Sequence, residues 1–118
     1  FGWGANSFPY LYKLKTGFWN DHSHNLFLEL SVSYGLLVSI SLFTIISNIL
    51  IKNFKFIFII QNKSSFIDKG WWAAGFVFFI THLFDMLIFD IRINLAIWII
   101  LVALKNTYNN NSKIFLHQ

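Results

Sequence analysis

Residues 26–51 read LFLELSVSYGLLVSISLFTIISNILI and carry a single charge, at Glu29. As one helix rising 1.5 Å per residue, this stretch would extend about 39 Å, enough to cross a hydrocarbon core of about 30 Å with some tilt. Glu29 would lie near the helix start, where a carboxylate favours the positive end of the helix dipole. The stretch therefore predicts a transmembrane helix.

The composition of the whole chain agrees with a membrane protein. Of its 118 residues, 56% are hydrophobic and 12% are charged, whereas an average soluble domain has about 25% charged residues. The net charge of +4 does not indicate a nucleic-acid partner, because the lysines are scattered between apolar runs rather than gathered in a basic stripe. The chain has no cysteine, which excludes disulfides and thiolate chemistry.

The segments on either side of the first predicted span are too polar or too short to cross a membrane. Residues 1–25 mix polar and aromatic side chains around the only proline, Pro9, and predict an extracytoplasmic loop with turns or a short interfacial helix. Residues 52–69 carry four lysines around the apolar run 56–60. They predict a cytoplasmic loop with an in-plane segment.

The second half of the chain predicts a membrane hairpin. Residues 70–104 would extend about 53 Å as one helix, longer than a membrane needs, so we expect two spans with a reversal around Asp85–Asp90. The last span would then begin near Leu87. Residues 105–118 are polar and predict a poorly ordered cytoplasmic tail.

The lysines orient the three predicted spans. Residues 52–69 and the tail hold six lysines, whereas residues 1–25 and the turn 85–92 hold three positive charges. The positive-inside bias places the first two segments in the cytoplasm. The sequence thus predicts an all-α membrane protein with about three transmembrane helices. Because residue 1 is Phe and no signal-peptide pattern follows it, we expect the chain to be the C-terminal part of a longer polytopic protein.

Two histidines and an asparagine, His22, His24 and Asn25, directly precede the first predicted span. With an ordinary pKa of about 6.5, a histidine at a membrane boundary could deprotonate a hydroxyl group, which Asn25 could position. One alternative is a helix cap without chemistry. Another is a metal site, which would need further ligands, and the only carboxylates nearby in the sequence are Asp21 and Glu29.

A second group of ionisable residues lies at the predicted reversal. Asp85, Asp90 and Arg92 are functional candidates because charged groups near membrane spans are costly. A guanidinium suits bidentate phosphate binding. The alternative is an Arg–Asp pair that neutralises itself at the turn. His82, three residues before Asp85, would share its helix face and could be its hydrogen-bond partner.

Three segments form a pattern along the chain. They are Gly2-Trp3-Gly4-Ala5-Asn6-Ser7-Phe8-Pro9; His24-Asn25 followed after nine residues by Gly35; and His82-Leu83-Phe84-Asp85 with Phe89-Asp90-Ile91-Arg92 and Trp98. In this order they resemble the C-terminal half of the O-antigen ligase/polymerase family of bacterial envelope glycosyltransferases. Val38 departs from the pattern, since members often have a small residue there.

The resemblance implies a multi-pass enzyme of the bacterial cytoplasmic (inner) membrane. Such an enzyme moves a glycan from a polyprenyl diphosphate to the hydroxyl of an acceptor glycan or lipid, in the synthesis of cell-surface polysaccharide. By resemblance, His24 would be the general base, and Asn25 and His22 would orient the acceptor. Arg92, with Asp90 and Asp85, would bind the substrate. The resemblance implies no metal and no nucleotide cofactor.

Two other functions stay open on the sequence alone. In a transporter similar to bicarbonate carriers, His82 and the charged residues of the reversal would form an ion pathway. Such a pathway needs ionisable residues deep in the spans, whereas here they fall near the predicted ends. In the other case the chain is an inactive structural fragment, because three spans with half an active site could insert without catalysing a reaction.

Overall fold

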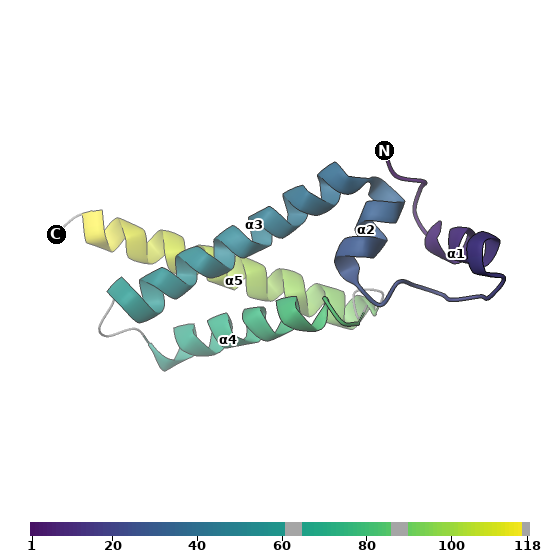
Figure 1. Ribbon diagram of the computed structural model, residues 1–118. Helices are drawn as coiled ribbons and strands as arrows, with labels where there is room; N and C mark the ends of the chain where they lie inside the picture. Colours follow the sequence, from purple (N-terminus) through teal and green to yellow (C-terminus); the bar gives the residue numbers. More distant parts are fainter. Residues whose placement is uncertain (61–64, 86–89, 117–118) are drawn as a thin grey trace.

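The computed structural model describes residues 1–60, 65–85 and 90–116, with side chains as far as residue 108 (Figure 1). All of the regular elements in these ranges are helical, which confirms the predicted all-α class for the described residues. They are α1 (Phe8–Thr16), α2 (Leu26–Tyr34), α3 (Leu36–Phe54) with its π-helical continuation η1 (Lys55–Ile60), α4 (Phe66–Thr81) and α5 (Ile91–Leu116).

The chain is elongated, with extents of 62 × 25 × 21 Å, and helices α3, α4 and α5 lie side by side in a bundle (Figure 1). Helices α1 and α2 lie at one end of this bundle, which we call the N-terminal end, and the C-terminus lies at the other. Helices α3 and α5 run away from the N-terminal end, and α4 returns toward it. The connections α1–α2 and α4–α5 therefore meet at the same end.

The bundle is packed around a small apolar core. Leu50, Ile100 and Leu104 are buried between α3, α4 and α5, and the indole Nε1 of Trp72 donates a hydrogen bond to the carbonyl oxygen of Leu50 at 2.9 Å. Gly75 brings α4 close to α5, since a Cβ atom there would lie only 2.8 Å from Cδ1 of Leu104. Close approach through small residues is typical of helix pairs in membranes.

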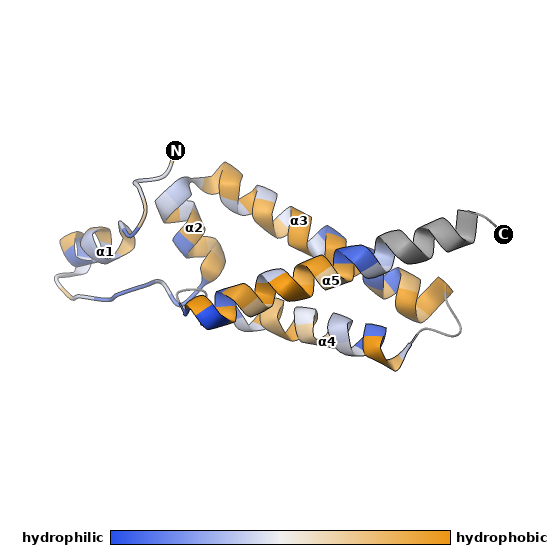
Figure 2. Ribbon diagram, turned by 180° about the vertical axis from the view of Figure 1, so that it is seen from behind, coloured by the Kyte–Doolittle hydropathy of each residue, from blue (hydrophilic) through white to orange (hydrophobic). Residues whose placement is uncertain are grey.

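Among the described residues, two helices are long and apolar enough to cross a membrane, over Leu36–Ile60 and Ile91–Tyr108. Only 17% and 11% of their most apolar windows are buried within the chain, whereas a core helix of a soluble protein would be mostly buried. Figure 2 shows hydrophobic residues along α3, α4 and α5 and hydrophilic ones in the α1–α2 connection and at the start of α5. These features indicate a membrane protein. Helix α4 has 16 residues and measures about 24 Å, less than a hydrocarbon core of about 30 Å.

The single helix predicted over residues 26–51 is wrong, because the chain breaks at Gly35. Its φ of 95° and ψ of 160° lie in a region that is essentially restricted to glycine. The hydroxyl groups of Ser31 and Ser39 span the break, with Ser31 donating to Ser39 at 3.0 Å and Ser39 to the carbonyl oxygen of Gly35 at 3.2 Å. Helix α2 consequently turns steeply away from α3 (Figure 1).

The in-plane loop predicted after residue 51 is also wrong as far as Ile60. The helix continues through Lys52 and Lys55, and Ile57 is 1% exposed. The ammonium group of Lys52 lies 5.8 Å from the centre of the Tyr108 ring on α5. The rings of Phe56 on η1 and Tyr108 on α5 also lie in contact, with centres 6.3 Å apart, so contacts with α5 extend beyond the predicted span. Residues 61–64 of the predicted loop lie outside the described residues.

The chain differs from the prediction near the C-terminus but not near the N-terminus, where a short helix was one of the two predicted forms. Residues 1–25 contain α1, which ends at Gly17 with a φ of 77°. The predicted tail is helical to Leu116, since residues 105–116 contain no glycine or proline that would stop a helix. Leu87, the predicted start of the last span, lies outside the described residues, and α5 begins at Ile91.

Candidate functional site

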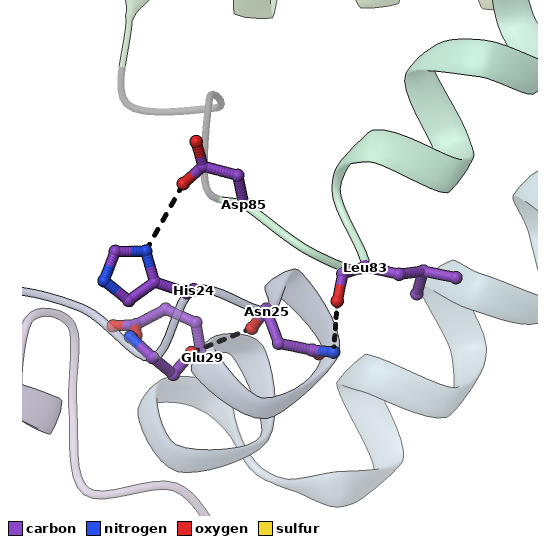
Figure 3. A network of polar contacts seen from close by, with 6 residues as sticks. His24, Asn25, Glu29, Leu83 and Asp85 are labelled. Atoms are coloured by element: carbon purple, nitrogen blue, oxygen red, sulfur yellow. Dashed lines mark hydrogen bonds and ion pairs between the residues drawn. The ribbon is translucent and has the colours of Figure 1, made fainter.

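Backbone contacts join the two connections at the N-terminal end of the bundle. The backbone N–H of Leu26 donates to the carbonyl oxygen of His82 at 2.9 Å. The side-chain amide of Asn25 donates to the carbonyl oxygen of Leu83 at 2.8 Å (Figure 3). These bonds tie the start of α2 to the end of α4. The segment with His22 and His24 is thereby held beside the segment with Asp85.

Asn25 is the N-cap of α2. Its φ of −151° is extended, and its side-chain oxygen accepts the backbone N–H of Leu28 at 3.1 Å. Asparagine is among the preferred N-cap residues because it satisfies a donor that the first helical turn leaves free. Each end of the Asn25 amide therefore makes a hydrogen bond within the chain. Asn25 thus caps a helix, which was one of the alternatives raised from the sequence.

The loop between the histidines is fixed by a buried carboxylate. Glu29, in the first turn of α2, is 5% exposed, and its Oε2 accepts the backbone N–H of Ser23 at 3.1 Å. The hydroxyl group of Ser23 donates to the carbonyl oxygen of Asn25 at 2.8 Å. Asp21 accepts the indole N–H of Trp19 at 2.6 Å. Both carboxylates that lie near the histidines in the sequence thus bind other groups.

His22, His24 and Asp85 form a cluster that we call the His–Asp cluster. Nδ1 of His24 lies 3.4 Å from Oδ1 of Asp85, and each of these side chains is 56% exposed (Figure 3). The ring centres of His22 and His24 are 4.6 Å apart. One ligand atom from each of the three residues lies within 4.8 Å of the other two.

Asp90 and Arg92, predicted to bind substrate together with Asp85, form the ion pair that was the alternative raised from the sequence. The guanidinium of Arg92 donates to both carboxylate oxygens of Asp90, at 3.2 and 2.9 Å. Asp90 also accepts the backbone N–H of Arg92 at 2.9 Å. These bonds to Arg92 lower the pKa of Asp90 from its ordinary value. Asp85 faces His24, and Asp90 faces Arg92.

His82 does not make the predicted hydrogen bond with Asp85. It is 3% exposed, and its Nδ1 donates to the carbonyl oxygen of Phe78 at 2.7 Å. Its Nε2 has no hydrogen-bond partner within the part of the chain that the structure describes. The ring lines an apolar cavity of about 50 Å³ between α3, α4 and α5. His82 therefore belongs to the bundle interior.

The glycines near the N-terminus serve a close backbone contact. The backbone N–H groups of Trp3 and Gly4 donate to the carbonyl oxygens of Val32 and Ser33, at 2.8 and 2.9 Å. A Cβ atom on Gly2 would lie 2.3 Å from the carbonyl oxygen of Ser33. The Gly-x-Gly segment thus docks the N-terminus onto the end of α2.

Comparison of the chain with protein-family models, with curated proteins and with solved structures finds no match. The chemistry of the site is therefore argued from its own geometry. The nine residues between Asn25 and Gly35 are those of α2. The His-Asn-x9-Gly pattern in this chain consists of an N-cap, one short helix and a glycine that ends it.

Asp85 has a role that the sequence did not predict, as the neighbour of His24. The two residues are 61 positions apart, and no local spacing relates them. One signal existed, because the lysine distribution placed residues 1–25 and the turn 85–92 on the same side of the membrane.

Proposed function

We propose that this chain is part of a membrane glycosyltransferase that joins a glycan from a polyprenyl-diphosphate donor to an acceptor hydroxyl group. One observation carries the proposal: an imidazole, His24, faces a carboxylate, Asp85, at the exposed end of an apolar helical bundle. The resemblance of His24-Asn25 and Gly35 to the O-antigen ligase/polymerase pattern supports the same function.

In the proposed reaction His24 is the general base. A proton on Nδ1 faces the Asp85 carboxylate, which orients the ring and stabilises the imidazolium that forms. Nε2 is then free to take the proton of the acceptor hydroxyl as its oxygen attacks the anomeric carbon. The bond from that carbon to the diphosphate breaks, and its electron pair leaves with the diphosphate. No metal ion or nucleotide takes part in this step.

Arg92, in its ion pair with Asp90, is the proposed binding group for the diphosphate. The Arg92 side chain is 87% exposed, and Arg92 lies in the first turn of α5, which begins at the same end of the bundle as α2. An exposed ion pair is weak, and a guanidinium binds phosphate oxygens in the same bidentate geometry that it uses for a carboxylate. A diphosphate would replace the Asp90 carboxylate as the group that accepts hydrogen bonds from the Arg92 guanidinium.

The proposed enzyme spans the membrane three times, with the His–Asp cluster on the extracytoplasmic side. Helices α3 and α5 run in the same direction, so crossing by both requires a return crossing by α4 between them. Lys52, Lys55 and Lys69 lie toward the end opposite the cluster. That distribution supports a cytoplasmic location for that end in a bacterial inner membrane.

The proposal is tested by the variants His24→Ala and Asp85→Asn, introduced into the gene as the cell carries it. A general base contributes about 10²–10⁴-fold to a rate, so we expect His24→Ala to abolish long surface polysaccharide on gels. Asp85→Asn, which keeps the side-chain shape, should shorten or deplete it. In isolated membranes given a polyprenyl-diphosphate-linked glycan, the transfer rate should be lowest for His24→Ala, intermediate for Asp85→Asn and highest for the parent.

Asp68→Asn is the matched control, because it removes a carboxylate from the first turn of α4 at the opposite end of the bundle. It should leave polysaccharide length and membrane insertion unchanged. Full-length polysaccharide in a correctly inserted His24→Ala variant would overturn the proposal.

A further inference from the structure

The distance between His24 and Asp85 is long for a hydrogen bond. Nitrogen and oxygen atoms in such a bond are usually 2.7–3.2 Å apart, whereas Nδ1 of His24 and Oδ1 of Asp85 are 3.4 Å apart. Two ligands of a tetrahedral zinc ion, each about 2.05 Å from it, lie about 3.3 Å from one another. The observed separation therefore suits two metal ligands as well as it suits a donor and its acceptor.

The third member of the His–Asp cluster completes a ligand set. One ligand atom of His22 lies within 4.8 Å of the ligand atoms of His24 and Asp85, and a rotation of an incompletely buried side chain would close that gap. Two imidazoles and one carboxylate, with a further position open to water, form a common set for transition-metal ions in proteins.

The backbone at the cluster is held before any ion arrives. Glu29 fixes Ser23 between the two histidines, and Asn25 ties the same loop to Leu83, two residues before Asp85. His24 itself is held at a φ of 53°, a conformation that costs free energy and persists only where its surroundings impose it.

We propose that His22, His24 and Asp85 bind one divalent transition-metal ion, for which Zn²⁺ is the probe. The proposal goes beyond the proposed transferase and does not depend on it. The site lies at the end of the bundle, and its ligands come from segments about 60 residues apart, so the ion would also bridge the α1–α2 and α4–α5 connections. Zinc bound at Nδ1 of His24 would leave a proton on Nε2. The ion would therefore block the general base and inhibit glycan transfer.

Zinc binding is measured by competition with a chromophoric chelator, using the purified protein in lipid nanodiscs. We expect one equivalent of Zn²⁺ to bind, and Mg²⁺ not to compete because it prefers oxygen ligands. Loss of an outer-shell partner costs about 10–100-fold in metal affinity, so loss of a ligand should cost at least about 100-fold. His22→Ala, His24→Asn and Asp85→Asn should each show this loss. Asparagine suits the left-handed backbone at position 24.

Asp21→Asn is the matched control. Asp21 is adjacent to His22 in the sequence, but its carboxylate accepts a hydrogen bond from Trp19, so this variant should bind Zn²⁺ as the parent does. The site would be overturned if zinc did not bind, if binding survived both His24→Asn and Asp85→Asn, or if Asp21→Asn weakened it as much as Asp85→Asn. Circular dichroism identifies any variant that has lost its helices. If His24→Asn or Asp85→Asn has lost them, the zinc affinity of His22→Ala tests the site instead.

The two proposals fail in different ways. A protein that binds one Zn²⁺ through these residues but transfers no glycan even after a chelator has removed the ion would overturn the transferase alone. A protein that transfers glycan and binds no zinc would overturn the metal site alone. If both hold, added Zn²⁺ should slow transfer and a chelator should restore it.

Discussion

His24 has a backbone conformation that most side chains resist. Its φ of 53° lies in the left-handed region, where a β-branched residue is strained because its Cβ substituents meet the backbone. We expect His24→Val to destabilise the protein by about 1–3 kcal/mol, measured by thermal unfolding in detergent micelles.

His22→Val is the control for this prediction, because His22 lacks a positive φ. Its effect should be smaller than that of His24→Val, because a β-branched residue at position 22 adds no left-handed strain. Equal destabilisation by the two variants would show that the strain at His24 is not the cause. His24→Gly, which removes the strain, should be at least as stable as the parent.

The individual candidates at the α2 start could be chosen from the sequence, but the partner of His24 could not. Histidine and asparagine directly before a long apolar run suffice to select His22, His24 and Asn25. Asp85 was identified as an ionisable group and predicted to bind substrate with Asp90 and Arg92, which stays a prediction, whereas its contact with His24 was not predicted. Spacing along a helix relates residues three or four apart, and it carries no information on a contact across 61 residues.

At the scale of elements, the break at Gly35 decides where the site lies. As a straight extension of α3, the nine residues of α2 would carry Asn25 about 14 Å farther along the helix axis. The break turns α2 so that its start meets the end of α4. An uninterrupted apolar stretch gave no sign of this, since glycine is frequent within transmembrane helices.

Gly35→Ala should disrupt this arrangement. The backbone there is accessible essentially to glycine alone, and an added Cβ would lie 3.0 Å from the backbone nitrogen of Gly2. We expect a loss of about 1–3 kcal/mol in the free energy of unfolding, measured by denaturant titration in micelles. Transfer activity should fall with it, because the start of α2 would no longer be fixed beside α4.

Gly70→Ala gives the matched comparison. Gly70 lies within α4, and an added Cβ would meet no atom within 4 Å. Alanine favours a helix over glycine by about 0.8–1.0 kcal/mol, so this variant should be as stable as the parent or slightly more so. A Gly35→Ala variant of equal stability would contradict the strained break.

At the scale of the whole molecule, the lack of cysteine permits a direct test of how the bundle lies in a membrane. Single cysteines can be introduced at Asp21 in the α1–α2 connection, at Phe84 after α4, and at Ser65 before it. With three crossings, Asp21→Cys and Phe84→Cys should react with a membrane-impermeant maleimide from outside the cell, and Ser65→Cys only after the membrane is opened. The unsubstituted chain, which should not react, is the control.

The labelling result distinguishes the two arrangements of α4. If Ser65→Cys and Phe84→Cys react from the same side, α4 does not cross the membrane, and the prediction of three spans is wrong. The ambiguity arose because the apolar run 70–104 was long enough for two short helices, while α4 alone measures about 24 Å. Composition established the helical class, but it could not establish the depth of each helix.

The bonds between α2 and α4 also set an order for biosynthesis. The ribosome makes His24 about 60 residues before Asp85, a delay of about 3–12 s at 5–20 residues per second. During that interval the Leu26 N–H and the Asn25 amide lack the carbonyl groups of His82 and Leu83 that they bind in the finished chain. The imidazoles and their carboxylate come together only when α4 has returned. A nascent chain that stops short of that point therefore carries the histidines without the site.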